Sequence, residues 1–319
     1  MRAVVGVVGI DHSLSNERKA NMSTILVVGA TGILGSEICR QLRAAGHTVR
    51  GLVRESSDPA KVSRLQSFGV ETVGGSVQDR ASVERACQGV NAVISTVSAM
   101  PFSYAPGTND VQSVDLDGVT NLIEAARVNN VSHFIYVSFS GNVDLDFPLR
   151  NAKREVERRL RESGLAFTIL RPSYFMEAWL SPVVGFDPVN AKATVYGTGQ
   201  NPISWIAVEN VAQFAVAALD HPGAKNAILE LGGPEALSPL EVIKVFENAG
   251  GRPFEMQFVP DDALLAQQAA ANDPMQQSFV GLMRCYAAGD PIAMADTLKT
   301  FAVQPSTVQE YAKRVLAPA

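Results

Sequence analysis

The chain has 319 residues, of which 46% are hydrophobic and 18% are charged, so it can bury a large core in one or two domains. Its formal net charge of −5 provides no basic field for nucleic acid, and its 4 histidines form no evident cluster of metal ligands. We therefore expect neither nucleic acid nor a metal ion as a partner.

Three cysteines, Cys39, Cys87 and Cys285, are widely spaced and odd in number, which predicts buried thiols in a reducing compartment rather than disulfides. No apolar run reaches the ~20 residues that a transmembrane helix needs. Residues 1–22 carry a short apolar patch and then a polar run without a clear cleavage signal, so we expect a flexible extension rather than a secretory signal. These features predict a cytoplasmic protein.

An apolar strand over residues 25–28 runs into a glycine turn, and an amphipathic helix follows over residues 36–45. Gly29 would permit the tight turn, Gly32 would let the backbone approach a pyrophosphate, and Gly35 would let the helix pack close to the sheet. The free N–H groups and the positive end of the helix dipole would then face the phosphates. The alternative is a crossover turn that is merely rich in glycine. The residues that we assign to the dinucleotide-binding turn are Gly29, Ala30, Thr31, Gly32, Ile33, Leu34 and Gly35.

The next predicted strand, residues 48–53, indicates which dinucleotide binds. An NAD site usually has an acidic residue at the end of this strand, whereas NADP requires cations there. The strand carries no acid and is followed by Arg54, although Glu55 comes next. Arg54 and Lys61 could bind a 2′-phosphate, so NADP is preferred and NAD stays possible. Alternatively, Arg54 is a solvated side chain at a strand end.

Strand and helix patterns then alternate with short connections. Predicted helices cover residues 61–67, 81–87, 114–128 and 148–163, and predicted strands cover residues 71–74, 92–97, 133–138, 166–170 and 227–231. This alternation predicts an α/β fold of the Rossmann type, a doubly wound parallel sheet with helices on both faces. The ligand crevice would lie at the carboxyl ends of the strands.

Beyond residue 171 the pattern loosens, which suggests a second, smaller domain. We assign residues 23–171 to the dinucleotide-binding domain, and residues 201–231 return to it with a strand and then a helix over 203–219. Residues 172–200 and 232–319, which include a strand over 254–259, would form a substrate-covering domain.

Residues at the predicted strand ends are candidates for cofactor contacts by position. Val77 would lie along the adenine, and Asp79 would cap the following helix. Ser95, Thr96 and Val97 would run beside the nicotinamide ribose, unless they form only a polar strand end.

Two further residues are candidates for contact with a substrate. Ser138, at a strand end, could bind a substrate carbonyl or merely cap the backbone. Tyr174 could present a phenol to the substrate, with core packing as the alternative. Its neighbourhood in the sequence favours a hydrophobic ligand, because it is rich in apolar and aromatic residues, namely Phe175, Met176, Trp179, Phe186 and Tyr196.

Several motifs together resemble one enzyme superfamily. The motifs are the glycine turn Gly29-Ala30-Thr31-Gly32-Ile33-Leu34-Gly35, Val53-Arg54, Tyr136-Val137-Ser138, Lys153 and Ile169-Leu170-Arg171-Pro172. As a set they resemble the short-chain dehydrogenases/reductases. The later segments Trp205-Ile206-Ala207-Val208-Glu209-Asn210-Val211-Ala212 and Leu231-Gly232-Gly233-Pro234 are similar to the atypical, NmrA-like and isoflavone-reductase-like branch. The resemblance covers about residues 23–260.

The resemblance implies roles for two residues and puts one mechanism in doubt. The superfamily usually has a tyrosine four residues before its catalytic lysine, but Leu149 stands at that position before Lys153 and cannot transfer a proton. In the isoflavone-reductase-like enzymes a lysine assists proton transfer, and Lys153 is the matching residue, which would also hold the ribose. The matching segment places Pro172 at the cofactor. The residues alone favour the other interpretation, in which Lys153 is one cation on a solvated helix that carries several arginines, and only the resemblance favours a role in the site.

These observations favour an NADP(H)-dependent reductase of a small hydrophobic enone, quinone or aromatic carbonyl, with Lys153 assisting proton transfer and Ser138 or Tyr174 polarising the acceptor. The alternative is a dinucleotide-binding sensor, regulator or assembly protein without turnover, because the NmrA-like branch includes regulators. A sugar-type epimerase or dehydratase is a third choice. The expected partner is a small molecule, and the chain would be a monomer or a homodimer.

Overall fold

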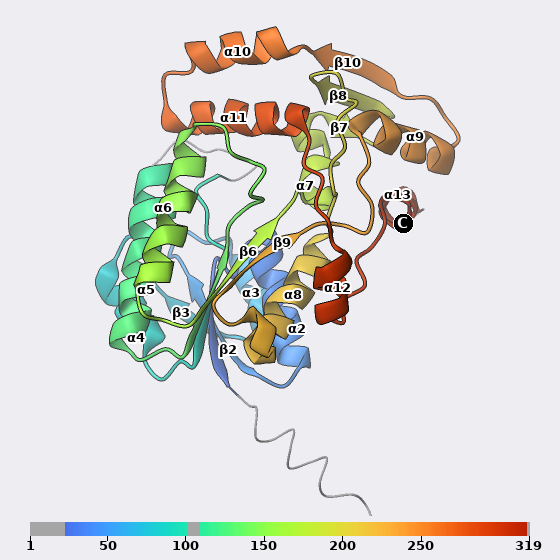
Figure 1. Ribbon diagram of the computed structural model, residues 1–319. Coiled ribbons are helices and arrows are strands. Elements are labelled where there is room, and N and C mark those ends of the chain that lie inside the picture. Colours follow the sequence, from blue (N-terminus) through green and yellow to red (C-terminus); the bar gives the residue numbers. More distant parts are fainter. Residues whose placement is uncertain (1–22, 101–108, 318–319) are drawn as a thin grey trace, which may run out of the picture.

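A computed structural model describes residues 23–100 and 109–317, so the extension expected over residues 1–22 lies outside the described residues. Parallel strands form the central sheet in the order β3-β2-β1-β4-β5-β6-β9 (Figure 1). These strands are β1 (Thr24–Val28), β2 (Thr48–Val53), β3 (Glu71–Gly74), β4 (Ala92–Ser95), β5 (His133–Val137), β6 (Phe167–Pro172) and β9 (Ala227–Leu231).

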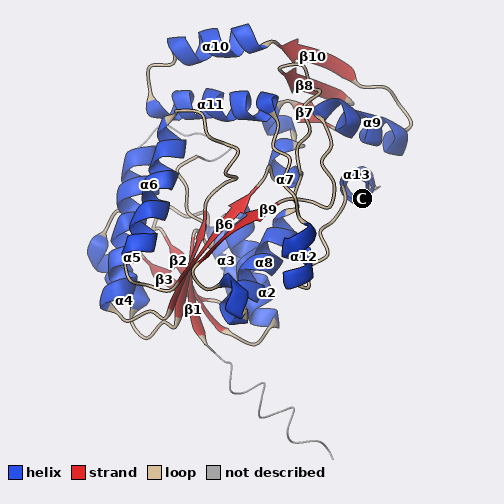
Figure 2. Ribbon diagram, viewed as in Figure 1, coloured by secondary structure: helices blue, strands red, loops and turns tan. Residues whose placement is uncertain are grey.

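Helices cover both faces of this sheet, as Figure 2 shows. On one face lie α4 (Arg80–Cys87), α5 (Asp117–Val128) and α6 (Pro148–Glu162), and on the other lie α2 (Ile33–Ala44), α3 (Pro59–Ser67) and α8 (Val208–Asp220). Strand β1 supplies both cores by alternation, because Leu26 and Val28 join the first group of helices while Ile25 and Val27 join the second. The doubly wound parallel sheet of the Rossmann type is therefore confirmed.

Two aspartate side chains cap helices by accepting hydrogen bonds from backbone N–H groups. Asp79 caps α4 as expected, since its Oδ1 accepts a hydrogen bond from the Ala81 N–H at 3.1 Å. The helix expected over residues 114–128 begins earlier, as a π-helix, η1 (Val111–Leu116), that runs into α5. A capping box fixes this start, because Asp110 Oδ1 accepts from the Ser113 N–H at 2.7 Å.

Beyond the carboxyl ends of the sheet lies a second group of elements (Figure 1). Its small sheet has the order β10-β8-β7, with β7 (Phe186–Asp187), β8 (Lys192–Tyr196) and β10 (Glu255–Val259). Its helices are α7 (Met176–Trp179), η2 (Pro182–Val184), α9 (Pro239–Gly250), α10 (Asp261–Ala270) and α11 (Pro274–Ala288). The remaining helices are η3 (Pro222–Ala224), α12 (Ala295–Thr300) and α13 (Val308–Leu316). The division of the chain into two domains at the bounds given above stays a prediction.

The strand expected at the start of residues 203–219 does not form, although the helix α8 does. Ile203 makes only isolated bridges, to Leu237 and to Asp290. The preceding Pro202 has no N–H to donate, and the backbone groups of this segment bind two different loops instead of one neighbouring strand.

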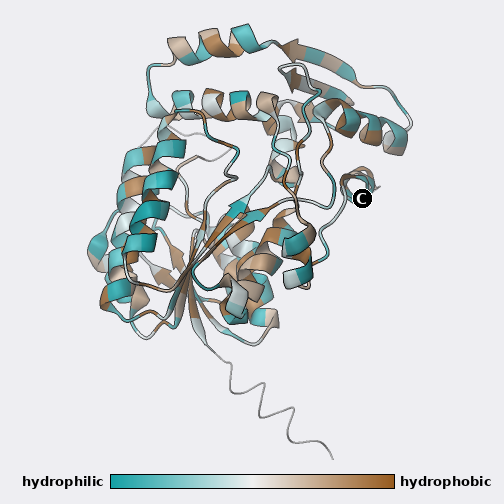
Figure 3. Cartoon of the chain, in the orientation of Figure 1, coloured by the Kyte–Doolittle hydropathy of each residue, from teal (hydrophilic) through white to brown (hydrophobic). Residues whose placement is uncertain are grey.

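Hydropathy separates the two sides of α6. Figure 3 shows a largely hydrophilic ribbon for this helix beside the hydrophobic strands of the sheet. The buried side carries Leu149, Val156 and Leu160, which join the core. Lys153 and Glu157 also lie on this buried side, so two charged residues of α6 point into the protein.

Candidate active site

The glycine turn between β1 and α2 has the geometry that its sequence predicts. Gly29 has a φ of 85°, a left-handed conformation that favours glycine. A Cβ at Gly35 would collide with the carbonyl oxygen of Gly29, so the helix packs as close to the turn as expected. Gly32 caps α2 with an ordinary φ of −74°, so its backbone does not require glycine. The pyrophosphate contact assigned to Gly32 stays a prediction.

A cavity of about 410 Å³ opens over this turn and along the carboxyl ends of β1 to β4. We call it the polar cleft. Most of the predicted cofactor residues line it, namely Gly29, Thr31, Gly32, Arg54, Lys61, Val77, Thr96 and Val97. The position agrees with the rule that ligands of parallel α/β sheets bind at the carboxyl ends of the strands.

The charge of the polar cleft comes from two exposed cations. Arg54 and Lys61 both line the cleft, and neither forms an ion pair with a described residue. The described residues that line the cleft include no Asp or Glu. Glu55, the acid that follows Arg54 in the sequence, does not line the cleft. Two unpaired cations without a competing carboxylate suit a phosphate group better than a pair of ribose hydroxyls.

A second cavity, of about 300 Å³, adjoins the polar cleft, because Thr96 and Ser98 line both. We call it the apolar cavity. Its walls are mainly aliphatic and aromatic and include Ile33, Leu34, Val137, Phe139, Leu149, Phe175, Trp179, Phe279 and Leu282. Lys153, Ser138, Tyr174 and Pro172 also line it, so the structure brings the three candidate catalytic residues together.

Three predicted cofactor residues line neither cavity, namely Ala30, Gly35 and Ser95. Ala30 and Ser95 are fully buried in the sheet and its turn. The Ser95 hydroxyl has no hydrogen-bond partner among the described residues. Direct contact of these three residues with a cofactor stays a prediction.

Lys153 is buried, with 6% of its surface exposed, so the interpretation of a solvated cation is wrong. Its Nζ lies 3.6 Å from Oδ1 of the buried Asp115 and 5.4 Å from the ring centre of Tyr136. Burial lowers the pKa of Lys153, while the charges of Asp115 and Glu157 oppose that effect. Sequence reasoning did not find Asp115, because it lies far from Lys153 in the chain and inside a helical pattern.

Leu149 and Tyr174 face the same cavity with different chemistry. Leu149 is buried and apolar, so the phenol that commonly stands four residues before the lysine is absent from this wall. Tyr174 packs edge-on against Trp179, and its hydroxyl donates a long hydrogen bond of 3.4 Å to the Leu282 carbonyl. Burial raises the pKa of Tyr174 well above its ordinary value, so the phenol keeps its proton.

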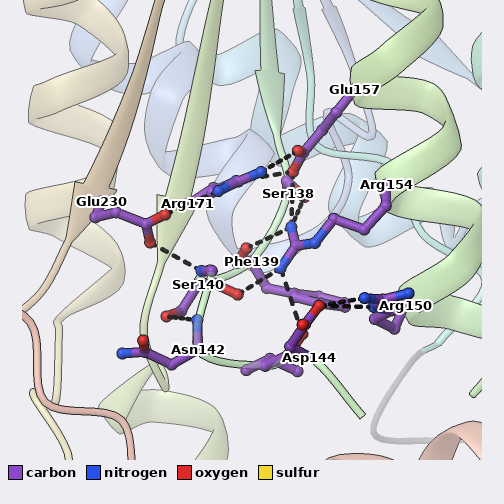
Figure 4. A network of polar contacts seen from close by, with 12 residues as sticks. Ser138, Phe139, Ser140, Asn142, Asp144, Arg150, Arg154, Glu157, Arg171 and Glu230 are labelled. Atoms are coloured by element: carbon purple, nitrogen blue, oxygen red, sulfur yellow. Dashed lines mark hydrogen bonds and ion pairs between the residues drawn. The ribbon is translucent and has the colours of Figure 1, made fainter. Parts of the chain in front are cut away.

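A network of charges behind the cavity holds the loop that carries Ser138 and Phe139 (Figure 4). The Arg154 guanidinium donates to the Ser140 carbonyl at 2.7 Å and to the Glu157 carboxylate at 2.8 Å. Arg171 pairs with Glu157 and, at 3.0 Å, with Glu230. The loop is therefore tied to β6, to β9 and to α6.

Glu157 is the centre of this network and also binds the candidate Ser138. Burial alone would raise the pKa of Glu157, but hydrogen bonds from Arg171 and Ser138 and the positive charge of Arg154 lower it. The Ser138 hydroxyl therefore belongs to the network, since it donates to Glu157 and accepts a long hydrogen bond of 3.4 Å from Arg154. Arg154 is one of the arginines on the helix that the sequence pattern predicts to be solvated, and no signal in the sequence pointed to Glu157.

Asp290 closes the apolar cavity from the segment that follows α11. It is fully buried, and its Oδ1 accepts hydrogen bonds from the Ser140 hydroxyl at 2.6 Å and from the Asn142 amide at 2.8 Å. Its Oδ2 has no hydrogen-bond partner among the described residues. The sequence offers no signal for this contact, because 150 residues separate Ser140 from Asp290.

Two further features concern metal ligands and membrane spans in the described part of the chain. The ranges 23–100 and 109–317 hold no group of 3 or more His, Cys, Asp or Glu side chains that could bind a metal ion. No helix in these ranges is long and apolar enough to cross a membrane. All 3 cysteines are free and buried, as predicted.

Comparison with known proteins gives close matches along most of the chain. The sequence model of the NmrA-like family matches residues 21–312. The NAD(P)H azoreductase of Xenophilus azovorans is 31% identical over 280 residues, which cover 86% of this chain and 91% of that protein. The photosystem II assembly factor Ycf39 of Trieres chinensis is 30% identical over 240 residues, which cover 74% and 72% of the two chains.

Among solved structures, that of AtPrR2 with NADP+ and (+)pinoresinol matches with a TM-score of 0.75. The match covers 93% of this chain and 99% of that chain, at 22% sequence identity. At this identity the likeness shows that the two chains share a fold.

Proposed function

The chain belongs to the NmrA-like family, and on that premise we propose that it is an NADP(H)-dependent reductase of a small hydrophobic acceptor, such as an enone, a quinone or an aromatic carbonyl. One observation carries the proposal. A polar cleft with two cations that pair with no described carboxylate adjoins an apolar cavity that has a buried lysine in its wall. Such a cavity, with a few convergent polar groups, is what a small-molecule site requires.

The residues of the polar cleft fit NADP. The glycine turn at Gly29 and Gly32 would hold the pyrophosphate, and Arg54 and Lys61 would hold the 2′-phosphate. The remaining contacts would come from Val77 at the adenine, from Thr96, Val97 and Lys153 at the nicotinamide ribose, and from Pro172 at the nicotinamide. The NAD(P)H azoreductase and the NADP+ complex of AtPrR2 support this choice of cofactor.

Lys153 would be the proton donor in the apolar cavity. When bound, NADPH would supply a hydride to the acceptor. Lys153 holds a proton at Nζ in the cavity wall and is placed to give it to the reduced acceptor, then to regain one from solvent. Leu149 cannot do this, and the Ser138 hydroxyl donates to Glu157. Tyr174 keeps its proton and would turn its hydroxyl from the Leu282 carbonyl to the oxygen of the acceptor.

A dinucleotide-binding sensor or assembly protein is the second candidate. It is supported by the similarity to the assembly factor Ycf39 and by the leucine at position 149. The apolar cavity argues for the reductase, since a protein without turnover needs no space beside the nicotinamide.

The test is oxidation of NADPH by the purified protein with a panel of hydrophobic quinones, enones and aromatic carbonyls, followed by identification of the reduced product. We expect acceptor-dependent oxidation with at least one member of the panel. Tight binding of NADPH without oxidation above the protein-free rate across the whole panel would favour the sensor.

A further inference from the structure

We propose that Asp115 is a positioning residue that keeps the ammonium of Lys153 charged and fixed in the wall of the apolar cavity. The inference rests on the proposed function for its catalytic meaning, but its physical content concerns the pair alone. It assigns a role to a carboxylate that does not line either cavity.

The π-helix η1 places Asp115 inside the protein. The side chain of Asp115 is fully buried, and its Oδ2 accepts a hydrogen bond from the Ala99 N–H at 2.8 Å. Aspartate is almost never fully buried unless it is paired. π-Helical turns are rare in proteins, and those that occur are often found at functional sites. The wider turn changes which side chains point inward.

The other carboxylate oxygen of Asp115 is directed to Lys153. Nζ of Lys153 lies 3.6 Å from Oδ1, and Lys153 is the ion-pair partner of Asp115 among the described residues. Oδ1 is buried and has no hydrogen-bond partner in that part of the chain. The carboxylate is thus held by the Ala99 N–H and by the Ser98 side chain, and its Oδ1 faces the ammonium.

Three elements place charged or polar groups around Lys153, namely η1, α6 and β5. Asp115 of η1 and Glu157 of α6 favour the charged lysine, whereas Arg154 of α6 opposes it. Tyr136 of β5 presents its ring face to Nζ at 5.4 Å, and its buried hydroxyl has no hydrogen-bond partner among the described residues. Because burial penalises the ammonium, Asp115 provides the largest opposing interaction.

A purely structural ion pair is the competing explanation, and it is the weaker one. A buried ion pair commonly stabilises a fold no more than apolar residues of the same size would. This pair differs from a core pair because Lys153 lines the apolar cavity while Asp115 lies behind it. The arrangement places the ammonium of Lys153 at the cavity, while the carboxylate of Asp115 does not contact the cavity.

The test replaces Asp115 by asparagine and measures the protonation of Lys153 directly. The amide oxygen of Asp115→Asn would take the Ala99 N–H, which leaves an NH2 group facing Nζ. Trace acetylation of the full chain with acetic anhydride, quantified at Lys153 by mass spectrometry against pH, reports the fraction of free amine. We expect the midpoint for Lys153 to move to lower pH in Asp115→Asn and to stay unchanged in the matched variant Asp117→Asn, whose carboxylate is exposed two residues away.

Activity gives the second readout. The alkaline limb of the kcat/KM profile should move to lower pH with the labelling midpoint, and kcat/KM at alkaline pH should fall by roughly 10-fold or more. If Asp115→Asn does not fold, Asp115→Glu serves as the test variant. Its carboxylate is displaced by one methylene group, so the labelling midpoint of Lys153 should stay unchanged and kcat/KM should fall.

An unchanged midpoint in folded Asp115→Asn, or an unchanged kcat/KM in Asp115→Glu, would overturn the proposal. If the parent protein oxidises no NADPH, the reductase proposal fails and the labelling of Lys153 still decides the role of Asp115.

Discussion

At the scale of single residues, Arg54 and Lys61 decide the electrostatics of the polar cleft. Both are exposed at the mouth of the cleft, and neither is bound to a carboxylate in the described part of the chain. A guanidinium can bind a phosphate through two parallel, charge-assisted hydrogen bonds. A ribose hydroxyl is uncharged and forms a weaker hydrogen bond with it. These side chains therefore favour NADPH over NADH.

Replacement of Arg54 by aspartate should reduce this preference. We expect the ratio of NADPH to NADH affinity to fall by roughly 10- to 100-fold, because a charge-assisted hydrogen bond is lost and a carboxylate is added. Calorimetric titration of both cofactors measures the ratio. Arg85→Asp is the matched control, since Arg85 is exposed on α4 and lines neither cavity. Equal affinities for both cofactors in the parent protein would contradict the assignment.

The candidate residues could be predicted from the sequence to different degrees. The glycine turn, Arg54 and Lys61 follow one another within a short stretch, so their common site is a local property. Lys153 required the resemblance to a known family, because its sequence neighbours are charged and point to a solvated helix face. Asp115 and Asp290 could not be predicted, because each meets its partner only through the tertiary fold.

At the scale of secondary structure, α6 connects the stability of the fold to the geometry of the cavity. Its buried side carries Lys153 toward the cavity and Glu157 toward the arginine network. The network ties the loop after β5 in place, and that loop supplies Ser138 and Phe139 to the cavity wall. A helix period predicts that these positions share a face, but it does not tell which face is buried.

Glu157→Gln should destabilise the protein and change its response to acid. Loss of the buried carboxylate removes the ion-pair partner of Arg154 and leaves Arg171 with Glu230 alone, which we expect to lower the free energy of unfolding by about 3 kcal/mol at neutral pH. The pKa of Glu157 is lowered in the folded state, so its stabilising contribution is present above its unfolded pKa and is lost as the pH falls through the folded value. The difference between parent and variant should therefore shrink on acidification.

Urea unfolding at several pH values measures this difference. Glu162→Gln is the matched control, because Glu162 pairs with Arg158 at the exposed end of α6 and should change the free energy of unfolding by less than about 1 kcal/mol. An equal loss in both variants, or a difference that does not depend on pH, would show that the network does not stabilise the loop.

At the scale of the whole molecule, the alternation of strands and helices was sufficient to predict the parallel sheet, its helical layers and the edge at which the polar cleft opens. The strands β2, β3 and β9 have the predicted bounds. The small sheet was only partly predicted. β10 shows a strand pattern, whereas β7 has only 2 residues and both β7 and β8 lie among prolines and glycines. Its pairing joins residues far apart in the chain, and local patterns carry no information on such contacts.

The same scale explains why the two cavities adjoin. The polar cleft belongs to the sheet and the glycine turn, while the apolar cavity is closed by Trp179, Phe279 and Leu282 from beyond the sheet. Their common border at Thr96 and Ser98 lies at the end of β4, near the centre of the parallel sheet. A cofactor that fills the cleft would therefore present its reactive end to the cavity.

The most direct test of this account is a single-turnover measurement that compares the parent with Lys153→Gln. Protein loaded with one equivalent of NADPH is mixed with an acceptor from the panel, and the absorbance band of the reduced nicotinamide is followed. We expect rapid decay in the parent and a decay that is slower by roughly 100-fold in Lys153→Gln, because glutamine cannot supply the proton. Decay at the parental rate in a variant that still binds NADPH would contradict the central claim that Lys153 performs the proton transfer.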